Sequence, residues 1–403
     1  MLTTVVAVVA VLLVLTRGQD TYVARPPSST EPSGAAEDVA PGLAAAALTR
    51  FADALRAGDP EAAARLAPAD DPAAARRLAG IAANARDLSL TDLDIRYVDQ
   101  STAPDAEGRW RAVADVRWRI AGFDPTSAQA EVSFVLQSDA SGVGIVSAGG
   151  GGDRSPLWLS GPITVRRAGE ALVQVAVSAR ADRYARLARV AIASVARTLD
   201  MPQSRLVVEV PATEPQLDRM LDASSGTYAG IAAVTAPVDG SDAADAPVHV
   251  FVNPEQFDQL RRAGAQVVMT HETTHAATGA VTSRAPLWLV EGFADYVALR
   301  NVALPITTTA AELIARTRRS GVPRALPSTA DFSVQASGLD ATYESAWIAC
   351  VIIGERVGTV GLERLYDRAG AGAPFAATLR QVTGLTLAQL TSTWRERLSD
   401  LAS

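Results

Sequence analysis

The 403-residue sequence contains no lysine, one cysteine and three histidines. All 37 basic residues are therefore arginine, which together with the abundant alanine indicates a coding bias rather than a basic binding surface. With a formal net charge of −7, the chain shows nothing that predicts nucleic acid as a partner. The lone cysteine, Cys350, excludes an intrachain disulfide, and its apolar surroundings, W-I-A-C-V-I-I, indicate a buried thiol without chemistry.

The chain begins with an apolar run that is short for a transmembrane helix. Residues 2–15 read LTTVVAVVAVLLVL, a length that suits a signal peptide better than a membrane span, which needs about 20 residues. Neither a basic segment before the run nor an A-x-A cleavage site after it is present. We interpret residues 1–17 as either a membrane anchor or a signal segment, with a buried strand or helix as the remaining alternative.

Residues 18–42 are rich in Pro, Ser and Glu and predict a disordered linker. An anchor followed by a tether predicts folded domains outside the cytoplasm, held at the cell membrane by a single span or secreted. At 403 residues the chain is too long for one ordinary hydrophobic core, so two folded domains are expected. We place them at residues 43–150 and 156–403, with the glycines of residues 149–152 at the join.

The first domain is predicted to combine helices with an antiparallel sheet. Residues 43–85 have a helical pattern that breaks at Gly58 and restarts at Asp59 and Pro60, a cap followed by a proline. In residues 109–120, R-W-R-A-V-A-D-V-R-W-R-I, the period of the apolar side chains changes to two, which predicts a β-strand. Three further segments near it have strand patterns. The prediction is an α+β domain with a four-stranded meander. Its element order resembles the NTF2-like fold, which implies a spacer or docking module or, alternatively, a small-ligand pocket.

The chemistry is concentrated between Val267 and Val297, where His271, Glu272 and His275 form the pattern H-E-x-x-H. On a helix, residues four apart lie one above the other, so the two imidazoles can share one metal ion. Glu272 follows His271 by about 100° of helical rotation, beside the open position of the metal, where a general base belongs.

A catalytic zinc site normally takes three protein ligands. After a loop, Pro286 is placed to open a second helix, P-L-W-L-V-E-G-F-A-D-Y-V, which carries Glu291 as the third candidate ligand. Asp295 lies one turn further on the same face and is placed to accept the second N–H of His271 or His275. The alternative interpretation is that the histidines are ordinary core residues and Glu291 a surface carboxylate.

H-E-T-T-H followed by W-L-V-E-G-F-A-D-Y resembles the gluzincin zinc metallopeptidases, the clan of thermolysin and the zinc aminopeptidases, and more closely the peptidase MA-like domains. The resemblance implies that His271, His275 and Glu291 bind Zn²⁺, that Glu272 is the general base for a zinc-activated water, and that Asp295 supports a ligating histidine. The implied substrate is a peptide or protein. The G-x-M-E-N motif of typical aminopeptidases is absent.

The element order from residue 156 onward also resembles gluzincin catalytic domains, in which a small twisted sheet lies over the active-site helix and a helical lobe closes the cleft. In that clan an edge strand of the sheet pairs with extended substrate, and either residues 228–236 or residues 247–252 are candidates here. His249 lies on the second of these, in an alternating apolar strand, and we interpret it as structural.

Residues 340–358 resemble the downstream helix of the clan, which commonly begins with a tyrosine near the catalytic centre. No histidine follows His275, so Tyr343 is the candidate donor to the tetrahedral oxyanion, with a packing role as the alternative and Tyr296 as the reserve candidate. Two functions remain open: an active zinc metallopeptidase, or a non-catalytic zinc-containing binding or sensory protein at the cell envelope.

Overall fold

The computed structural model describes residues 41–139, 142–150, 153–333 and 336–403. The predicted anchor or signal segment, and all but the last two residues of the predicted linker, lie outside the described residues. Within the described part, the chain divides into two compact units. The N-terminal unit comprises residues 41–121 and 127–162, and the C-terminal unit comprises residues 122–126 and 163–403.

Three helices open the N-terminal unit: α1 (Pro41–Ala57), α2 (Pro60–Ala64) and α3 (Pro72–Leu88). The break between the first two falls at Gly58, which has a positive φ of 59°. Asp59 then caps α2, because its side chain accepts hydrogen bonds from two backbone N–H groups of the first turn. Asp71 caps α3 in the same way. Aspartate followed by proline therefore accounts for both helix starts.

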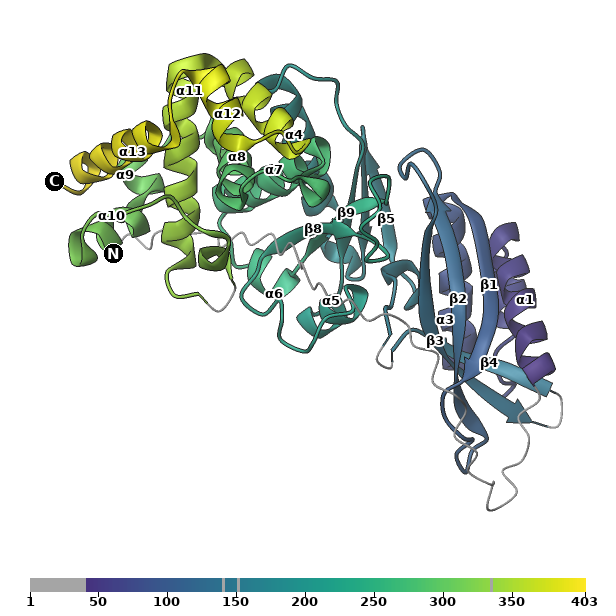
Figure 1. Ribbon diagram of the computed structural model, residues 1–403. Helices are drawn as coiled ribbons and strands as arrows, with labels where there is room; N and C mark the ends of the chain where they lie inside the picture. The colour runs from purple at the N-terminus through teal and green to yellow at the C-terminus, as the bar shows by residue number, and fades with distance from the viewer. Residues whose placement is uncertain (1–40, 140–141, 151–152, 334–335) are drawn as a thin grey trace, which may run out of the picture. The chain divides into compact units, whose positions relative to one another are not determined.

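A four-stranded antiparallel sheet follows in the order β1-β2-β3-β4. Its strands are β1 (Leu90–Gln100), β2 (Arg109–Ile120), β3 (Ala128–Asp139) and β4 (Gly142–Ala148). Every second side chain of β2 is buried, from Trp110 to Ile120, as the alternation predicts. Helices α1 and α3 lie along this sheet (Figure 1). The predicted mixture of helix and meander is confirmed, whereas the likeness to the NTF2-like fold stays a prediction.

The C-terminal unit contains a second sheet, with five strands in the order β5-β6-β7-β9-β8. They are β5 (Thr164–Ala168), β6 (Ala171–Val175), β7 (Leu206–Val210), β8 (Ala233–Pro237) and β9 (Val248–Val252). The three inner strands run parallel, and the two edge strands are antiparallel to their neighbours. β8 is therefore an edge strand, whereas β9 is paired on both sides.

Strand β8 begins at Ala233, five residues after the start of the candidate strand at residues 228–236. The preceding stretch is held in a turn, because the carbonyl of Tyr228 accepts a hydrogen bond from the side chain of Asn253, at 2.8 Å. The carbonyl of Ala229 accepts a hydrogen bond from the side chain of Gln256, a residue that follows β9 in the sequence. These contacts from a distant part of the sequence decide where the strand begins.

Helices α4 (Ala181–Thr198) and α7 (Arg262–Thr278) cover one face of this sheet. Their apolar side chains pack with the inward-pointing valines of the inner strands in one core: Val173, Val175, Val208, Val250, Val252, Tyr184, Ala188, Val268 and Met269. The short helices α5 (Glu214–Met220) and α6 (Pro254–Phe257) follow β7 and β9. Because the core fixes the rotation of α7 about its axis, it also decides which α7 side chains point elsewhere.

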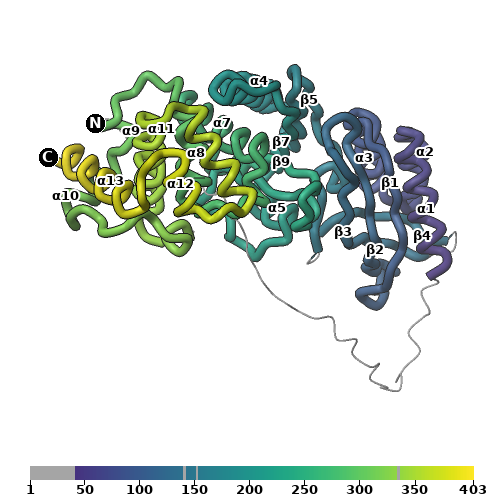
Figure 2. Tube along the Cα trace, turned by 45° about the horizontal axis from the view of Figure 1, so that its top comes forward, coloured from purple at the N-terminus to yellow at the C-terminus, as the bar shows by residue number. Residues whose placement is uncertain are grey.

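The rest of the C-terminal unit is a helical lobe with its own core. It contains α8 (Leu287–Leu299), α9 (Ile306–Thr309), α10 (Ala311–Ser320), α11 (Leu339–Gly370), α12 (Phe375–Thr383) and α13 (Leu387–Ala402). Helices α8 and α11 lie side by side (Figures 1 and 2). A Cβ atom on Gly292 of α8 would come within 2.4 Å of the carbonyl oxygen of Ala346, so glycine is required for this close approach.

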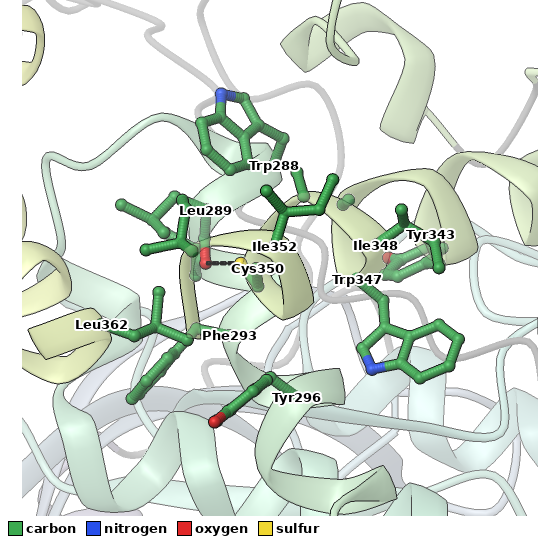
Figure 3. Packing of buried hydrophobic residues seen from close by; sticks show 14 of the residues in the cluster. Trp288, Leu289, Phe293, Tyr296, Tyr343, Trp347, Ile348, Cys350, Ile352 and Leu362 are labelled. Carbon is green, nitrogen blue, oxygen red and sulfur yellow. Dashed lines mark hydrogen bonds between the residues drawn. The ribbon is translucent and has the colours of Figure 1, made fainter. Parts of the chain in front are cut away.

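Cys350 lies in the same contact, with its Sγ 4.0 Å from the carbonyl oxygen of Leu289 (Figure 3). Cys350 is completely buried, which confirms the prediction, and this burial raises the pKa of its thiol well above the usual value. Among the described helices, α11 alone is long and apolar enough to cross a membrane, but half of its most apolar stretch is buried inside the protein. Gly358, with a φ of 73°, interrupts this helix.

Candidate metal centre

Helix α7 presents the H-E-x-x-H residues inside the protein. It runs from Arg262 to Thr278 and ends at Gly279, which has a φ of 63°. Its threonine hydroxyls are hydrogen-bonded within the helix. Each of the four hydroxyls donates to the backbone carbonyl four residues before it; the four donors are Thr270, Thr273, Thr274 and Thr278. The two histidines and Glu272 are the buried polar side chains of α7 that such bonds do not satisfy.

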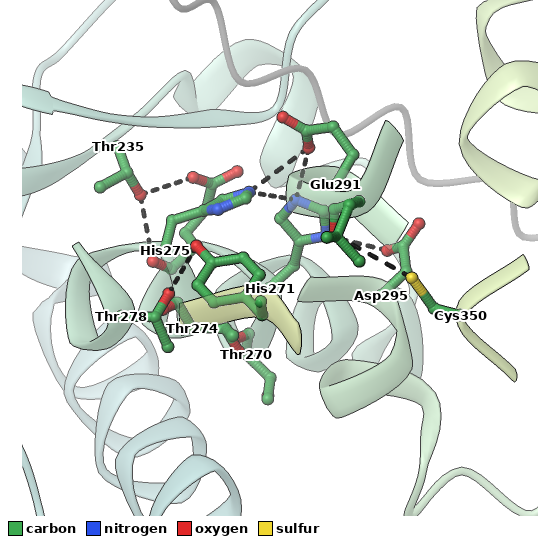
Figure 4. Close-up of polar contacts among 12 residues, drawn as sticks. Thr235, Thr270, His271, Thr274, His275, Thr278, Glu291, Asp295 and Cys350 are labelled. Atoms are coloured by element: carbon green, nitrogen blue, oxygen red, sulfur yellow. Dashed lines mark hydrogen bonds and ion pairs between the residues drawn. The ribbon is translucent and has the colours of Figure 1, made fainter. Parts of the chain in front are cut away.

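Three candidate ligand atoms converge from two helices. The Nε2 atoms of His271 and His275 are 2.8 Å apart, and Oε2 of Glu291 on α8 lies 3.3 and 3.4 Å from them (Figure 4). Tetrahedral coordination at zinc–ligand distances near 2.0–2.1 Å places neighbouring ligand atoms about 3.3 Å apart. The two distances to Glu291 match this value, whereas the distance between the two nitrogens is about 0.5 Å shorter. The structure brings the three predicted ligands together, all essentially without solvent exposure.

Asp295, one turn beyond Glu291, lies on the other side of His271. Its Oδ1 is 2.8 Å from Nδ1 of His271. A carboxylate at this distance holds the proton on Nδ1, which leaves the lone pair of Nε2 directed at Glu291 and His275. The sequence left open whether Asp295 contacts His271 or His275, and in the structure it contacts His271.

The chemistry of the donor set also fits a cation. Without one, two imidazole nitrogens at 2.8 Å would oppose their lone pairs or share a single proton. Oε1 of Glu291, on the same carboxyl group as the candidate ligand atom, is buried and has no hydrogen-bond partner among the described residues. Buried polar atoms are rarely left unpaired, and two nitrogens with a carboxylate oxygen form a donor set typical of zinc.

The electrostatics of the cluster point the same way. Burial acts to lower the pKa of His271, but Asp295 and Glu291 raise it to about 10. Burial acts to raise the pKa of Glu291, yet the two histidines lower it below its usual value. The first shift shows that the carboxylates around His271 stabilise a positive charge there. The second shows that Glu291 stays ionised, as a carboxylate that binds a metal must be.

Glu272 directly follows His271, and none of the hydrogen bonds of its carboxyl group among the described residues goes to the candidate ligands. It is fully buried, and this burial raises the pKa of its carboxyl group. Oε2 accepts a hydrogen bond of 2.7 Å from the hydroxyl of Thr235 on β8 (Figure 4), whereas Oε1 has no partner among the described residues. Thr235 could not be predicted from the sequence, because no local pattern connects β8 with α7.

The two tyrosine candidates lie in different surroundings. The ring of Tyr343, on the first turns of α11, is 6.3 Å from the ring of His271 and packs edge-on against Phe332. The hydroxyl of Tyr296 instead contacts Thr359 at 3.0 Å and accepts a hydrogen bond from Arg300. Only Tyr343 is adjacent to the cluster.

His249, the third histidine, is held in a separate buried cluster. Its Nδ1 is 2.7 Å from Oε1 of Glu209 on β7, and its Nε2 is 2.9 Å from Oδ1 of Asp124. Asp124 belongs to the segment 122–126 of the C-terminal unit. Burial acts to lower the pKa of His249, but the two carboxylates raise it to about 9. A charged imidazole between two carboxylates supports the interpretation that this residue is structural.

Comparisons with known proteins leave the family open. No family model matches the sequence, and no curated protein matches it. Among solved structures, the chain is similar to an M1 zinc metallopeptidase of Deinococcus radiodurans, a point mutant bound to a Tyr-Ser-Ala substrate, with 11% sequence identity and a TM-score of 0.30. The match covers 74% of this chain and 61% of that protein. So low a TM-score carries no functional argument, and function has to be inferred from the site.

Replacing Asp295 with asparagine should weaken metal binding without unfolding the protein. The amide keeps a hydrogen-bond acceptor near His271 Nδ1 but removes the negative charge that makes this ligand basic. We expect zinc affinity to fall about 10- to 100-fold in competition titrations with a chromophoric chelator. Asp367→Asn, on α11, is the control and should bind zinc as the wild type does. Equal affinity of Asp295→Asn and wild type would exclude this role.

His249 should make stability depend on pH in the alkaline range. Its folded-state pKa of about 9 exceeds the ordinary value of 6.5, so its stabilising effect is complete below pH 6.5 and is lost as the pH rises through 9. The loss is on the order of 3 kcal/mol. Urea unfolding of wild type and His249→Gln between about pH 6 and pH 10 checks this. The variant should be less stable at the acid end, with a flatter pH profile; parallel profiles would contradict the prediction.

Proposed function

We propose that this protein is a zinc-dependent metallopeptidase that hydrolyses peptide bonds. The observation that carries the proposal is the convergence of His271 Nε2, His275 Nε2 and Glu291 Oε2 beside a buried carboxyl group, Glu272, that is not part of the ligand triangle. Structural zinc sites are usually closed by four protein ligands, whereas three ligands with an adjacent base are typical of hydrolytic sites.

The protein residues have separate roles in this proposal. His271, His275 and Glu291 hold the zinc, which when bound polarises the scissile carbonyl and acidifies a water molecule. Glu272 accepts the proton of the attacking water and passes it to the leaving amine. The raised pKa of its carboxyl group suits this exchange, because a general base works best when its pKa lies nearer the working pH.

The sheet provides a place for an extended substrate. Of the two candidate strands, β9 is paired on both sides, whereas β8 has β9 as its only neighbour in the described sheet. A peptide can therefore add to β8 by backbone hydrogen bonds. Because β8 also carries Thr235, which contacts Glu272, a peptide bound there runs past the candidate base.

The second function, a zinc-containing binding or sensory protein, is favoured by one observation. The three ligands and Glu272 are almost completely buried, as in a site that only holds a metal. Location outside the cytoplasm, at the membrane or secreted, rests on residues 1–42 and stays a prediction. Peptide or protein substrates are proposed from the site alone.

Glu272→Gln separates the two functions. Because only the base is removed, the variant should bind one zinc per chain like the wild type and lose cleavage of a peptide library by at least about 100-fold. Glu214→Gln is the matched control, since Glu214 is also buried with a raised pKa but lies on α5. Bound zinc without cleavage by the wild type would favour the binding protein, and absence of zinc would overturn both.

Tyr343→Phe tests the oxyanion donor. The substitution keeps the ring that packs on Phe332 and removes only the hydroxyl. We expect zinc content and KM to remain unchanged and kcat to fall about 100- to 1000-fold, the usual effect of removing one such donor. Tyr296→Phe is the control, because its hydroxyl contacts Thr359 and Arg300. Equal kcat values for Tyr343→Phe and wild type would assign Tyr343 to packing.

A further inference from the structure

Thr235 places a hydroxyl on the face of β8 that is directed toward the core. Thr235 is opposite Val250 of β9, and Val250 belongs to the core between the sheet and the helices. Burying a hydroxyl among apolar side chains costs free energy unless it is hydrogen-bonded, and valine would fill the same space without that cost. The contact that the hydroxyl makes therefore needs an explanation.

That contact is to Glu272. The hydroxyl lies 2.7 Å from Oε2 of the carboxyl group and 3.1 Å from the backbone carbonyl oxygen of the same residue. A hydroxyl has one proton to donate, and a carboxylate oxygen is the stronger acceptor. The shorter distance agrees with donation to Oε2, so the bond fixes the end of a side chain that otherwise has several rotatable bonds.

The bond makes the two carboxyl oxygens of Glu272 different. Oε2 is engaged by Thr235, whereas the buried Oε1 has no partner among the described residues. A general base must reach the proton that it abstracts, and an error of about 1 Å in such a position can reduce a rate about 100-fold. Holding one oxygen in place is an effective way to direct the other.

We infer that Thr235 is a positioning residue, whose hydroxyl holds Oε2 of Glu272 so that Oε1 is the atom that exchanges protons with the substrate. This inference rests on the proposed peptidase function. Oε1 takes one proton from the attacking water as the new carbon–oxygen bond forms, and returns it to the leaving nitrogen as the carbon–nitrogen bond breaks. Thr235 keeps its own proton throughout. Since Thr235 is part of the edge strand proposed to bind peptide, the same strand aligns both substrate and base.

The test compares Thr235→Val, which keeps the shape, with Thr235→Ser, which keeps the hydroxyl. Zinc content, thermal midpoint, kcat and KM are measured on the whole protein. We expect Thr235→Val to keep its zinc and a KM within about twofold of wild type, and to lose about 10- to 100-fold in kcat. Thr235→Ser should retain kcat within about threefold. Thr378→Val, which removes another buried threonine hydroxyl, should retain full activity.

Crystal structures of wild type, Thr235→Val and Thr235→Ser test the position of the Glu272 carboxyl group without relying on activity. The carboxyl group of Glu272 should leave its position in the valine variant and keep it in the serine variant. If the valine variant does not fold, Thr235→Ala replaces it. An unmoved Glu272 in the variant that lacks the hydroxyl, or a serine variant as impaired as the valine variant, would overturn the inference.

These readings distinguish the two proposals. If the wild type binds zinc but cleaves nothing, the peptidase function fails, and the crystal structures alone decide whether Thr235 holds the carboxyl group. If the wild type is active and Thr235→Val equals it in kcat, the peptidase function stands and the role of Thr235 fails. A structural role alone would lower the thermal midpoint without the difference in kcat between valine and serine.

Discussion

The candidate centre depends on a balance of charges among buried side chains. Glu291 and the two histidines of α7 are buried within hydrogen-bond distance of one another, and burial by itself would favour the neutral forms of His271 and Glu291. Charged neighbours shift the pKa of each of these two groups in the opposite direction, toward its charged form. Such a cluster is stable only while all its members are in place, so the packing that holds α7 against α8 is a condition for the chemistry.

Each of the two helices is also held by a further neighbour, α8 by α11 and α7 by the sheet. Gly292, next to Glu291, lets α8 approach the backbone of α11, where a Cβ atom would meet a carbonyl oxygen. On the other side, the valines of the inner strands and the apolar face of α7 form a core that fixes the rotation of that helix. Two separate cores therefore aim the histidines and Glu291 at one point.

The sheet also has polar contacts on both of its faces. Thr235 reaches Glu272 on the helix side, whereas His249, the next position along in the β8–β9 pairing, is bound between Glu209 and Asp124. Alternation along the strands places these neighbours on opposite faces. One ladder of the sheet thus contributes to the candidate catalytic site on one side and to a charged structural cluster on the other.

The sequence by itself determined the elements and the candidate ligands. Asp59–Pro60, the alternation of β2 and the spacing of His271 and His275 are local patterns, and the physics of capping, pleating and helical periodicity acts over a few residues. The helix that Pro286 was expected to open added Glu291 and Asp295 through the same periodicity, and the resemblance to a known motif implied the same roles. The start of β8 could not be predicted in the same way, because side chains of the following segment hold residues 228–229 in a turn.

Only the tertiary structure decided what lies around the ligands. It assigned Asp295 to His271, made β8 rather than β9 the edge strand, brought Tyr343 rather than Tyr296 to the cluster, and joined Thr235 to Glu272. These contacts join positions far apart in the sequence and carry no period or motif of their own. They follow from the order of the strands and the packing of α7, α8 and α11, which local sequence rules do not contain.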